Sequence, residues 1–297
     1  MRRDIEFNAD GVTLRGWFYP PKGKKRGGPV VVMAHGFTAV KEMTLDRYAE
    51  VFSNGGLGAL VYDNRNLGTS DGEPRHDIDP AMQRRDYRYA ITFAQSLPEV
   101  DPKRVGIWGT SYTGGAVLAV AALDRRVKAV VSQVPFVNGL RNIEQFLRLS
   151  ELPDFVAMLD ADRQRRMQGK PSEYVKVCAE DPAEPHAFPG LRTYNYFHKY
   201  MKEVRKCTWE NRVTIRSLEY LMEYDVTGYM RRISPTPLFM IVSENDSATP
   251  TDLALEMFDL ARDPKELMVV KADHYASYLE AFDSTSAAAR DFFLRHL

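Results

Sequence analysis

Short runs of apolar residues recur along the chain, and glycine, proline or polar residues bound each run. Six of these runs are four or five residues long and mostly apolar, with many β-branched side chains, and they lie at 30–33, 59–62, 105–108, 129–132, 238–242 and 267–270. Continuous apolar runs of this length are typical of strands buried on both faces, as in a parallel sheet covered by helices. The pattern therefore predicts six buried, parallel strands.

The segments between these runs follow a different period, with apolar residues at helical spacing. Examples are 44–54, 80–96 and 252–261. Strands that alternate with helices in this way indicate a doubly wound α/β sheet. Ahead of the first run, the segments 5–7 and 12–19 predict an antiparallel pair of strands joined by a tight turn.

The regular recurrence of strand-like apolar runs stops after Pro135 and resumes only at Pro237. About a hundred residues are too many for one loop in a compact domain, so this segment must have structure of its own. Its apolar pattern predicts helices at 140–149, 153–166, 191–206 and 213–222. We therefore expect a sheet domain made of residues 1–136 and 235–297, into which residues 137–234 are inserted as a helical cap.

The charge balance disfavours some classes of partner. The chain has 297 residues, with 40 Lys and Arg against 40 Asp and Glu, so its net charge is zero when histidine is neutral. A chain without excess positive charge has no electrostatic reason to bind nucleic acid or an anionic membrane. The same balance is compatible with a homodimer. No stretch approaches the roughly 20 consecutive apolar residues of a membrane-spanning helix.

Targeting signals and cysteines indicate the expected compartment. Two arginines near the N-terminus are not followed by the apolar run of a secretory signal, and the only cysteines are Cys178 and Cys207. Two cysteines make no disulfide framework, so we expect buried free thiols in a reduced, cytoplasmic protein. The basic stretch 22–28 is expected to be a solvated loop.

The strongest chemical signal is a strand followed by a sharp turn and an Ala-rich helix, at residues 105–122. Such a turn forces its central residue, Ser111, into a strained backbone conformation and exposes the hydroxyl at the carboxyl end of the strand. Small residues must flank the serine because strand and helix come close there. Gly109 meets this requirement, but Thr113 occupies a position where glycine is usual. The glycine spacing fits neither a dinucleotide-binding nor a Walker phosphate loop, so a serine nucleophile is the better interpretation.

A serine hydroxyl needs a base to remove its proton, and the base needs a carboxylate to orient it. In folds with this turn, the order along the chain is serine, acid, histidine. Asp246 follows the run at 238–242, and His274 follows the last run. We therefore predict that His274 is the base and Asp246 the acid. Glu244, which lies closer to the strand end, remains an alternative acid.

The negative oxygen formed by attack on a carbonyl needs backbone N–H donors. One donor is expected from Tyr112, directly after the serine, and the second from Phe37, in the loop after the first parallel strand. His35 in that loop is expected to be structural, as are Asp63 and Arg65, which would brace a neighbouring loop by pairing with each other. The spacing of His, Cys, Asp and Glu residues fits no metal site, and neither a metal nor another cofactor is expected.

Together these motifs resemble one branch of the α/β-hydrolase superfamily. The segments that carry the resemblance are His35-Gly36-Phe37, Tyr62-Asp63-x-Arg65-x-x-Gly68-x-Ser70-Asp71-Gly72, Asp101-Pro102-x-Arg104-Val105-Gly106 and Gly109-x-Ser111. More closely, the chain resembles the fungal polyketide transferase and thiohydrolase family, of the fumagillin polyketide transferase type. The match is specific across the sheet domain and loose across the cap.

The resemblance implies an α/β-hydrolase fold in which the sheet domain is catalytic. It also implies an enzyme of secondary metabolism that takes a hydrophobic acyl chain from a polyketide synthase carrier domain, or from a related thioester. The acceptor of that chain would be water or an alcohol.

The cap is rich in aromatic and Met side chains, more so than a solvent-facing layer needs. Most of them are expected to pack the cap against the sheet, while a few line an apolar pocket for the acyl chain. The predicted substrate contacts are Phe136, Phe146, Tyr194 and Trp209.

The residues alone predict a serine hydrolase or acyltransferase that cleaves an ester or thioester through an acyl-enzyme. Two alternatives stay open at this stage. A cyclase, lyase or C–C bond hydrolase could use the same three residues, and a non-catalytic protein that binds a hydrophobic ligand could keep the fold. The second alternative is disfavoured because all three catalytic positions are filled.

Overall fold

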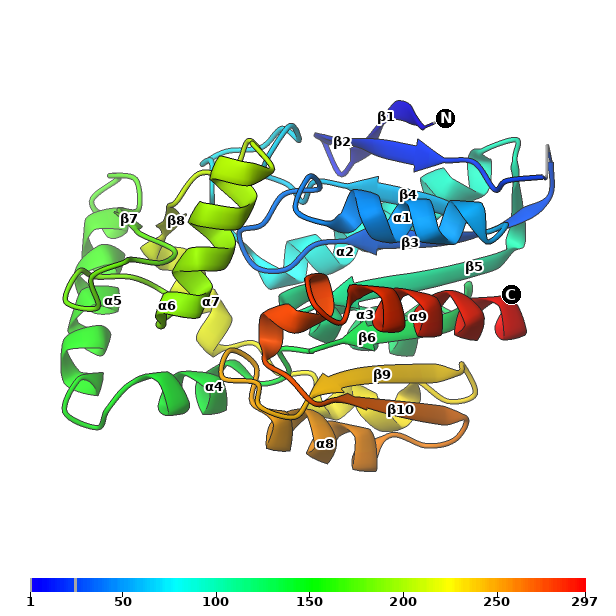
Figure 1. Ribbon diagram of the computed structural model, residues 1–297. Helices are drawn as coiled ribbons and strands as arrows, with labels where there is room; N and C mark the ends of the chain where they lie inside the picture. Colours follow the sequence, from blue (N-terminus) through cyan, green and yellow to red (C-terminus); the bar gives the residue numbers. More distant parts are fainter. Residues whose placement is uncertain (1, 24–25) are drawn as a thin grey trace.

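The sheet of this protein is mixed, and most of it is parallel. A computed structural model describes residues 2–23 and 26–297, so the basic loop predicted at 22–28 lies partly outside the described residues. Within the described residues eight strands form one sheet: β1 (Arg3–Ala9), β2 (Val12–Tyr19), β3 (Gly28–Ala34), β4 (Gly58–Tyr62), β5 (Val100–Thr110), β6 (Val127–Gln133), β9 (Leu238–Ser243) and β10 (Lys265–Val270). Their order across the sheet is β1-β2-β4-β3-β5-β6-β9-β10 (Figure 1).

The strand directions agree with the hydrophobic pattern. β1 pairs with β2 and β2 with β4 in antiparallel fashion, whereas all neighbouring pairs from β4 to β10 are parallel. Every residue of β3, β4 and β9 is buried. The six predicted parallel strands and the predicted antiparallel pair are therefore confirmed.

β10 corrects one expectation from the pattern. The run at 267–270 indicates a strand buried on both faces, but β10 is the edge strand, and Leu267 and Val269 are 37% and 47% exposed. Aliphatic and β-branched residues favour strands even where one face is open to solvent. The pattern thus identifies the strand without identifying its neighbours.

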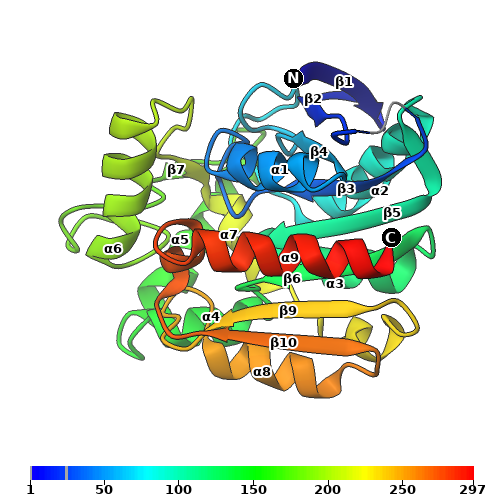
Figure 2. The ribbon, with the colours of Figure 1, turned by 45° about the vertical axis from the view of Figure 1, so that its right-hand side comes forward.

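Helices cover both faces of the sheet. On one face, α1 (Leu45–Asn54) and α9 (Phe282–His296) pack against each other (Figures 1 and 2). The other face carries α2 (Pro80–Ser96), α3 (Tyr112–Leu123) and α8 (Thr251–Leu260). α3 is buried through all but its last residue, since it lies between the sheet and its neighbouring helices. This arrangement confirms the predicted α/β-hydrolase fold.

The chain between β6 and β9 contributes no strand to the main sheet within the described residues. Its elements are α4 (Gly139–Phe146), α5 (Leu152–Met167), β7 (Tyr174–Val175), α6 (Leu191–Tyr194), the π-helix η1 (Asn195–Val204), β8 (Val213–Thr214), α7 (Ile215–Met222) and the 3₁₀ helix η2 (Thr227–Arg232). Most of them lie beyond the carboxyl ends of the parallel strands, at the left of Figure 1. The assignment of residues 137–234 as a domain of its own stays a prediction.

Two elements of this cap differ from the expected helices. The helix predicted at 213–222 begins as β8, which pairs with β7 in a small antiparallel sheet. Val213 and Thr214 are β-branched and favour this extended start. The helix predicted at 191–206 has one turn of α-helix, α6, before the ten residues of η1. π-helical segments are rare and occur frequently at functional sites.

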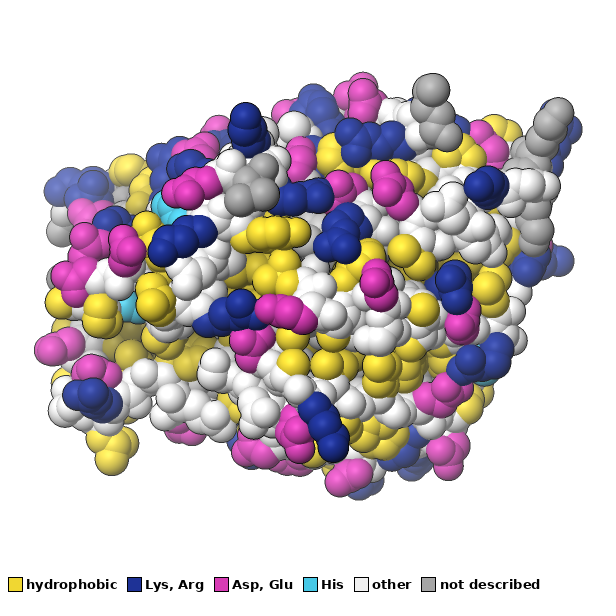
Figure 3. Space-filling view, in the orientation of Figure 1, with side chains coloured by type: hydrophobic (Ala, Val, Ile, Leu, Met, Phe, Trp, Pro, Cys, Tyr) yellow, Lys and Arg dark blue, Asp and Glu magenta, His cyan; other side chains and the backbone are white. Residues whose placement is uncertain are grey.

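Charges of both signs are interspersed over the face shown in Figure 3, where Lys and Arg side chains lie next to Asp and Glu side chains. Ion pairs such as Arg3–Glu99 join some of the charged side chains of the protein. In the described part of the chain, no helix is both long enough and apolar enough to cross a bilayer. Cys178 and Cys207 are buried free thiols, as predicted.

Candidate active site

Ser111 lies at the turn between β5 and α3, with φ 55° and ψ −122°. A positive φ is unfavourable for a residue with a side chain and persists only where its surroundings hold it. Here the end of β6 holds it. The N–H of Ser111 donates to the carbonyl of Gln133 over 2.9 Å, and its carbonyl accepts from the N–H of Phe136, also over 2.9 Å.

Close packing around this turn explains the glycines that flank it. A Cβ atom on Gly109 would lie 2.2 Å from the backbone oxygen of Thr113, and one on Gly115 would lie 1.9 Å from the backbone oxygen of Phe136. Both distances are far below van der Waals contact, so only glycine fits. Thr113 is itself buried, and its hydroxyl accepts a hydrogen bond from the N–H of Thr110 over 3.1 Å.

His274 begins the 3₁₀ helix η3 (His274–Tyr278), which follows β10. Its Nδ1 lies 2.7 Å from Oδ2 of Asp246, and both side chains are almost fully buried. Because a carboxylate only accepts, Nδ1 carries the proton, and the lone pair is on Nε2. The structure thus joins the predicted base to the predicted acid, which lies 28 residues before it in the chain.

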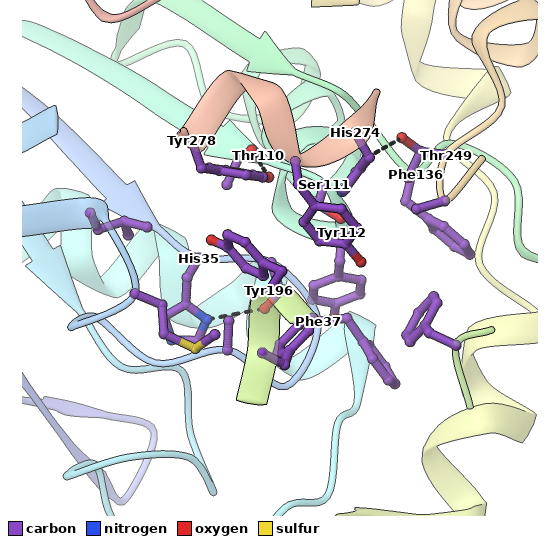
Figure 4. Close-up of a pocket in the computed structure, with 18 of the residues that line it drawn as sticks. His35, Phe37, Thr110, Ser111, Tyr112, Phe136, Tyr196, Thr249, His274 and Tyr278 are labelled. Atoms are coloured by element: carbon purple, nitrogen blue, oxygen red, sulfur yellow. Dashed lines mark hydrogen bonds between the residues drawn. The ribbon is translucent and has the colours of Figure 1, made fainter. Parts of the chain in front are cut away.

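The loop after β9 holds the Asp246 carboxylate in place. Oδ1 accepts from the backbone N–H groups of Ala248, over 2.9 Å, and Thr249, over 2.7 Å. The Thr249 hydroxyl lies 2.9 Å from Oδ2 and 3.1 Å from Nδ1 of His274 (Figure 4). By contrast, the side chain of Glu244 is exposed. Among the described residues, Asp246 is the one candidate acid of the two that is hydrogen-bonded to His274.

Ser111 and His274 line the same cavity (Figure 4). Between these two described residues no hydrogen bond joins the Ser111 hydroxyl to the His274 ring. Most of the cavity wall is aromatic or aliphatic, contributed by both the sheet domain and the cap.

The predicted oxyanion donors, Phe37 and Tyr112, also line this cavity. Among the described residues no hydrogen bond engages the N–H of Phe37. The N–H of Tyr112 is in the first turn of α3, where N–H groups have no partner within the helix. Their rings pack edge to face, 5.8 Å apart. Both backbone donors are thus available beside Ser111.

Charged residues behind the loop that contains Phe37 pair differently from the prediction. Asp63 binds Lys41, with 2.7 Å between Oδ2 and Nζ, and its Oδ1 lies 3.7 Å from Nε2 of His35. Arg65 instead makes a two-point contact with Asp86 on α2. The predicted Asp63–Arg65 pair is wrong, because Asp63 points inward under the loop while Arg65 reaches toward α2.

Of the four predicted substrate contacts, Phe136 lines the catalytic cavity and Phe146 lines a neighbouring cavity under the cap. Tyr194 stacks on the His198 ring at 4.7 Å, and Trp209 packs on the Phe197 ring at 5.0 Å. Neither of these two side chains lines either cavity, and Tyr194 lines a separate pocket with Lys176 and His198. A substrate contact by Tyr194 or Trp209 stays a prediction.

Composition alone did not predict which side chains of the cap face the cavity. Tyr196 and Phe197 of η1 both line the cavity. Tyr275 and Tyr278 contribute from η3 and Phe188 from a cap loop. Their closeness in sequence to His274, within about one helical turn, could have identified the two tyrosines. No such feature of the sequence marks Phe188.

No group of three or more His, Cys, Asp or Glu side chains within the described residues has the geometry of a metal site. The groups with chemistry at this cavity include the Ser111 hydroxyl and the His274 imidazole, which is paired with the Asp246 carboxylate.

Known proteins of similar sequence are fungal enzymes. The chain is 34% identical to a thiohydrolase of Eupenicillium brefeldianum, over 95% of this chain and 90% of the relative. It is 32% identical to the polyketide transferase grgF of Penicillium sp, over 100% of this chain and 97% of the relative. The family model of acetyl xylan esterase (AXE1) matches residues 84–168, the segment that contains the Ser111 turn.

Known structures are similar over the whole chain. The crystal structure of the α/β hydrolase GrgF from Penicillium sp. sh18 has a TM-score of 0.85 at 31% identity and covers 100% of this chain and 99% of that one. DcsB, in complex with its substrate analogue, has a TM-score of 0.88 at 26% identity and covers 100% of both chains. The similarity therefore includes the cap as well as the sheet.

Proposed function

This chain belongs to the fungal polyketide transferase and thiohydrolase family of α/β-hydrolases, and on that premise we propose that it transfers a hydrophobic, polyketide-like acyl group from an ester or thioester to water or an alcohol. One observation carries the proposal. Ser111, on a strained turn, and His274, bound to Asp246, face one cavity with apolar walls.

The first half-reaction forms an acyl-enzyme. Oγ of Ser111 attacks the carbonyl carbon of the substrate while Nε2 of His274 takes the hydroxyl proton. Asp246 keeps the proton on Nδ1 and stabilises the imidazolium that forms. The electron pair of the carbonyl bond moves to oxygen, and the N–H groups of Phe37 and Tyr112 donate to that negative oxygen.

Collapse of the tetrahedral intermediate breaks the bond between the acyl carbon and the leaving sulfur or oxygen. His274 gives its proton to the leaving group, and the acyl group stays on Ser111. Water or an alcohol then attacks the ester, with His274 again as base, and Ser111 is released. The leaving thiol can be a small molecule or a carrier domain, because both present the same sulfur.

The walls of the cavity support an uncharged acyl group. Aromatic rings from both the sheet domain and the cap face it, among them Phe136, Phe188 and Tyr196, and no Lys or Arg lies among its lining residues. A charged acyl group would lose its hydration there without gaining a partner. An apolar chain gains free energy as its surface leaves water.

Replacement of the nucleophile tests the proposal. Ser111→Ala should lower kcat for an N-acetylcysteamine thioester of a medium-chain fatty acid by a factor on the order of 10⁶. It should also abolish labelling by a fluorophosphonate, which phosphonylates activated serines with loss of fluoride. Ser284→Ala is the matched control, because Ser284 is exposed on α9, away from the cavity.

Mass spectrometry of the trapped protein gives a second measurement. During turnover the acyl mass should be found on the peptide that contains Ser111. Fluorophosphonate labelling that survives Ser111→Ala would contradict the proposal. Turnover without an acyl adduct would instead favour a cyclase, lyase or C–C bond hydrolase that uses the same residues.

A further inference from the structure

A second cavity lies under the cap, next to the catalytic cavity. Its lining residues come mainly from α4, α5, α7 and the segment 185–188. Phe136, Phe188 and Leu221 line both cavities. The two cavities therefore share a wall, and two aromatic rings and a leucine form it.

Phe188 is the ring of this wall that contacts side chains of both cavities. Its ring packs edge to face on Phe37 at 5.2 Å on the catalytic side, and on Phe146 at 5.8 Å on the cap side. Its backbone N–H is held by the carbonyl of Val177 over 2.8 Å, but its side chain is only half-buried. Rotation of the Phe188 ring would join the cavities while the backbone stays in place.

The second cavity is apolar except at one side. Its polar lining residues are Glu151, Asp154 and His186, and no Lys or Arg lies among its lining residues. Glu151 accepts a hydrogen bond from the N–H of Arg148 over 2.8 Å. Asp154 is exposed, and within the described residues its carboxylate is neither hydrogen-bonded nor ion-paired. The cavity thus combines apolar walls with an acidic rim that lacks a compensating cation.

We propose that this second cavity is the subsite for the distal end of the acyl chain. The chain passes from Ser111 between Phe136 and Phe188 into the cap, and its far end lies near Glu151 and Asp154. The rim accepts an alkyl, hydroxyl or amine terminus and repels a carboxylate. This inference rests on the proposed function, and it adds chain length and the chemistry of the far end to the description of the substrate.

Filling the second cavity tests the subsite. Leu147 and Met158 line it without lining the catalytic cavity, so Leu147→Trp and Met158→Trp fill it and leave the catalytic residues unchanged. Leu149→Trp is the matched control, because Leu149 lies two residues from Leu147 and is 90% exposed. The measurement is the rate of Ser111 phosphonylation by two probes, an ethyl and a dodecyl fluorophosphonate.

The unmodified protein should react faster with the dodecyl probe, since each buried methylene is worth about a threefold to fourfold gain. The two filled variants should lose about tenfold or more of the dodecyl rate and keep the ethyl rate. Leu149→Trp should keep both rates. The subsite is wrong if both filled variants keep the dodecyl rate of the unmodified protein. Failure of the ethyl probe to label Ser111 in the unmodified protein overturns the proposed function itself.

The acidic rim has its own test. The probes are N-acetylcysteamine thioesters of dodecanoic acid that carry either a hydroxyl or a carboxylate at the far end. Asp154→Lys should raise kcat/KM for the carboxylate probe relative to the hydroxyl probe by about fivefold. Asp160→Lys makes the same charge change on an exposed residue of α5 outside the cavity, and should leave the ratio unchanged. Equal ratios in the two variants would overturn the role of the rim.

Discussion

The hydroxyl of Thr113 donates a hydrogen bond to the backbone carbonyl of Ala34 over 2.8 Å. Ala34 is the last residue of β3 and leads into the loop that contains Phe37, while Thr113 lies two residues after Ser111. The threonine that replaces the usual glycine therefore ties the serine turn to the loop with the proposed oxyanion donor. It does so without crowding, because the side chain lies in a buried gap between strand and helix.

Removal of this hydroxyl should weaken both the fold and the reaction. Thr113→Val keeps the shape of the side chain but leaves the carbonyl of Ala34 and the N–H of Thr110 buried without a partner. We expect a loss of about 1–3 kcal/mol in the free energy of unfolding, measured in urea, and slower acylation. Thr113→Ser keeps the hydroxyl and should retain most of both. Equal behaviour of the two variants would contradict this role.

The acid of the proposed triad can be identified by comparing two carboxylates. Asp246→Asn leaves an amide beside Nδ1 of His274, which favours the wrong tautomer, and kcat should fall by about 10⁴. Glu244→Gln changes an exposed side chain and should leave kcat within about twofold of the unmodified protein. Steady-state kinetics on a p-nitrophenyl ester measure both. A large loss in Glu244→Gln with little in Asp246→Asn would reverse the assignment.

The buried ion pair between Asp63 and Lys41 should make the stability of the fold depend on pH. Burial alone raises the pKa of the Asp63 carboxyl, but the His35 ring and the Lys41 ammonium outweigh it and hold the pKa well below its usual range. A carboxyl with a lowered folded pKa stabilises the fold above its unfolded pKa of about 4, and this contribution is lost as the pH falls through the folded value.

Asp63→Asn should therefore lower the free energy of unfolding at neutral pH by about 3 kcal/mol, because Lys41 is left buried without that carboxylate. The difference in Tm from the unmodified protein should shrink as the pH falls below about 4. Thermal unfolding over a series of pH values measures this. A difference in Tm that stays constant would show that the ionised pair contributes no stability.

Close packing at the serine turn predicts intolerance to a single methyl group. Gly109→Ala places a Cβ atom 2.2 Å from the backbone of Thr113 and should cost about 1–3 kcal/mol of stability and most of the activity. Gly228→Ala is the control, since its φ is negative and no described atom lies within 4 Å of the place that the added methyl group would take. Tm and ester turnover should change only in Gly109→Ala.

Local patterns predicted much of the fold because each strand and helix has its own period of apolar residues. The limits of that approach are visible at three places. β10 has the composition of a buried strand but lies at the sheet edge, the segment 213–222 begins as a strand, and Asp63 pairs with Lys41 rather than Arg65. In each case the outcome depends on neighbours that are far away in the chain, which a local pattern does not contain.

For the candidate site, the sequence by itself determined the chemistry. The turn around Ser111, the order of Ser111, Asp246 and His274, and the loop with Phe37 follow from residue type and position at strand ends. Only the tertiary structure decided which side chains meet. It paired His274 with Asp246, gave Thr113 a partner on β3, and placed Phe188 between two cavities while it moved Tyr194 and Trp209 away from them. The physical reason is that contact depends on the direction of each side chain in the packed fold, and that direction is set by residues distant in sequence.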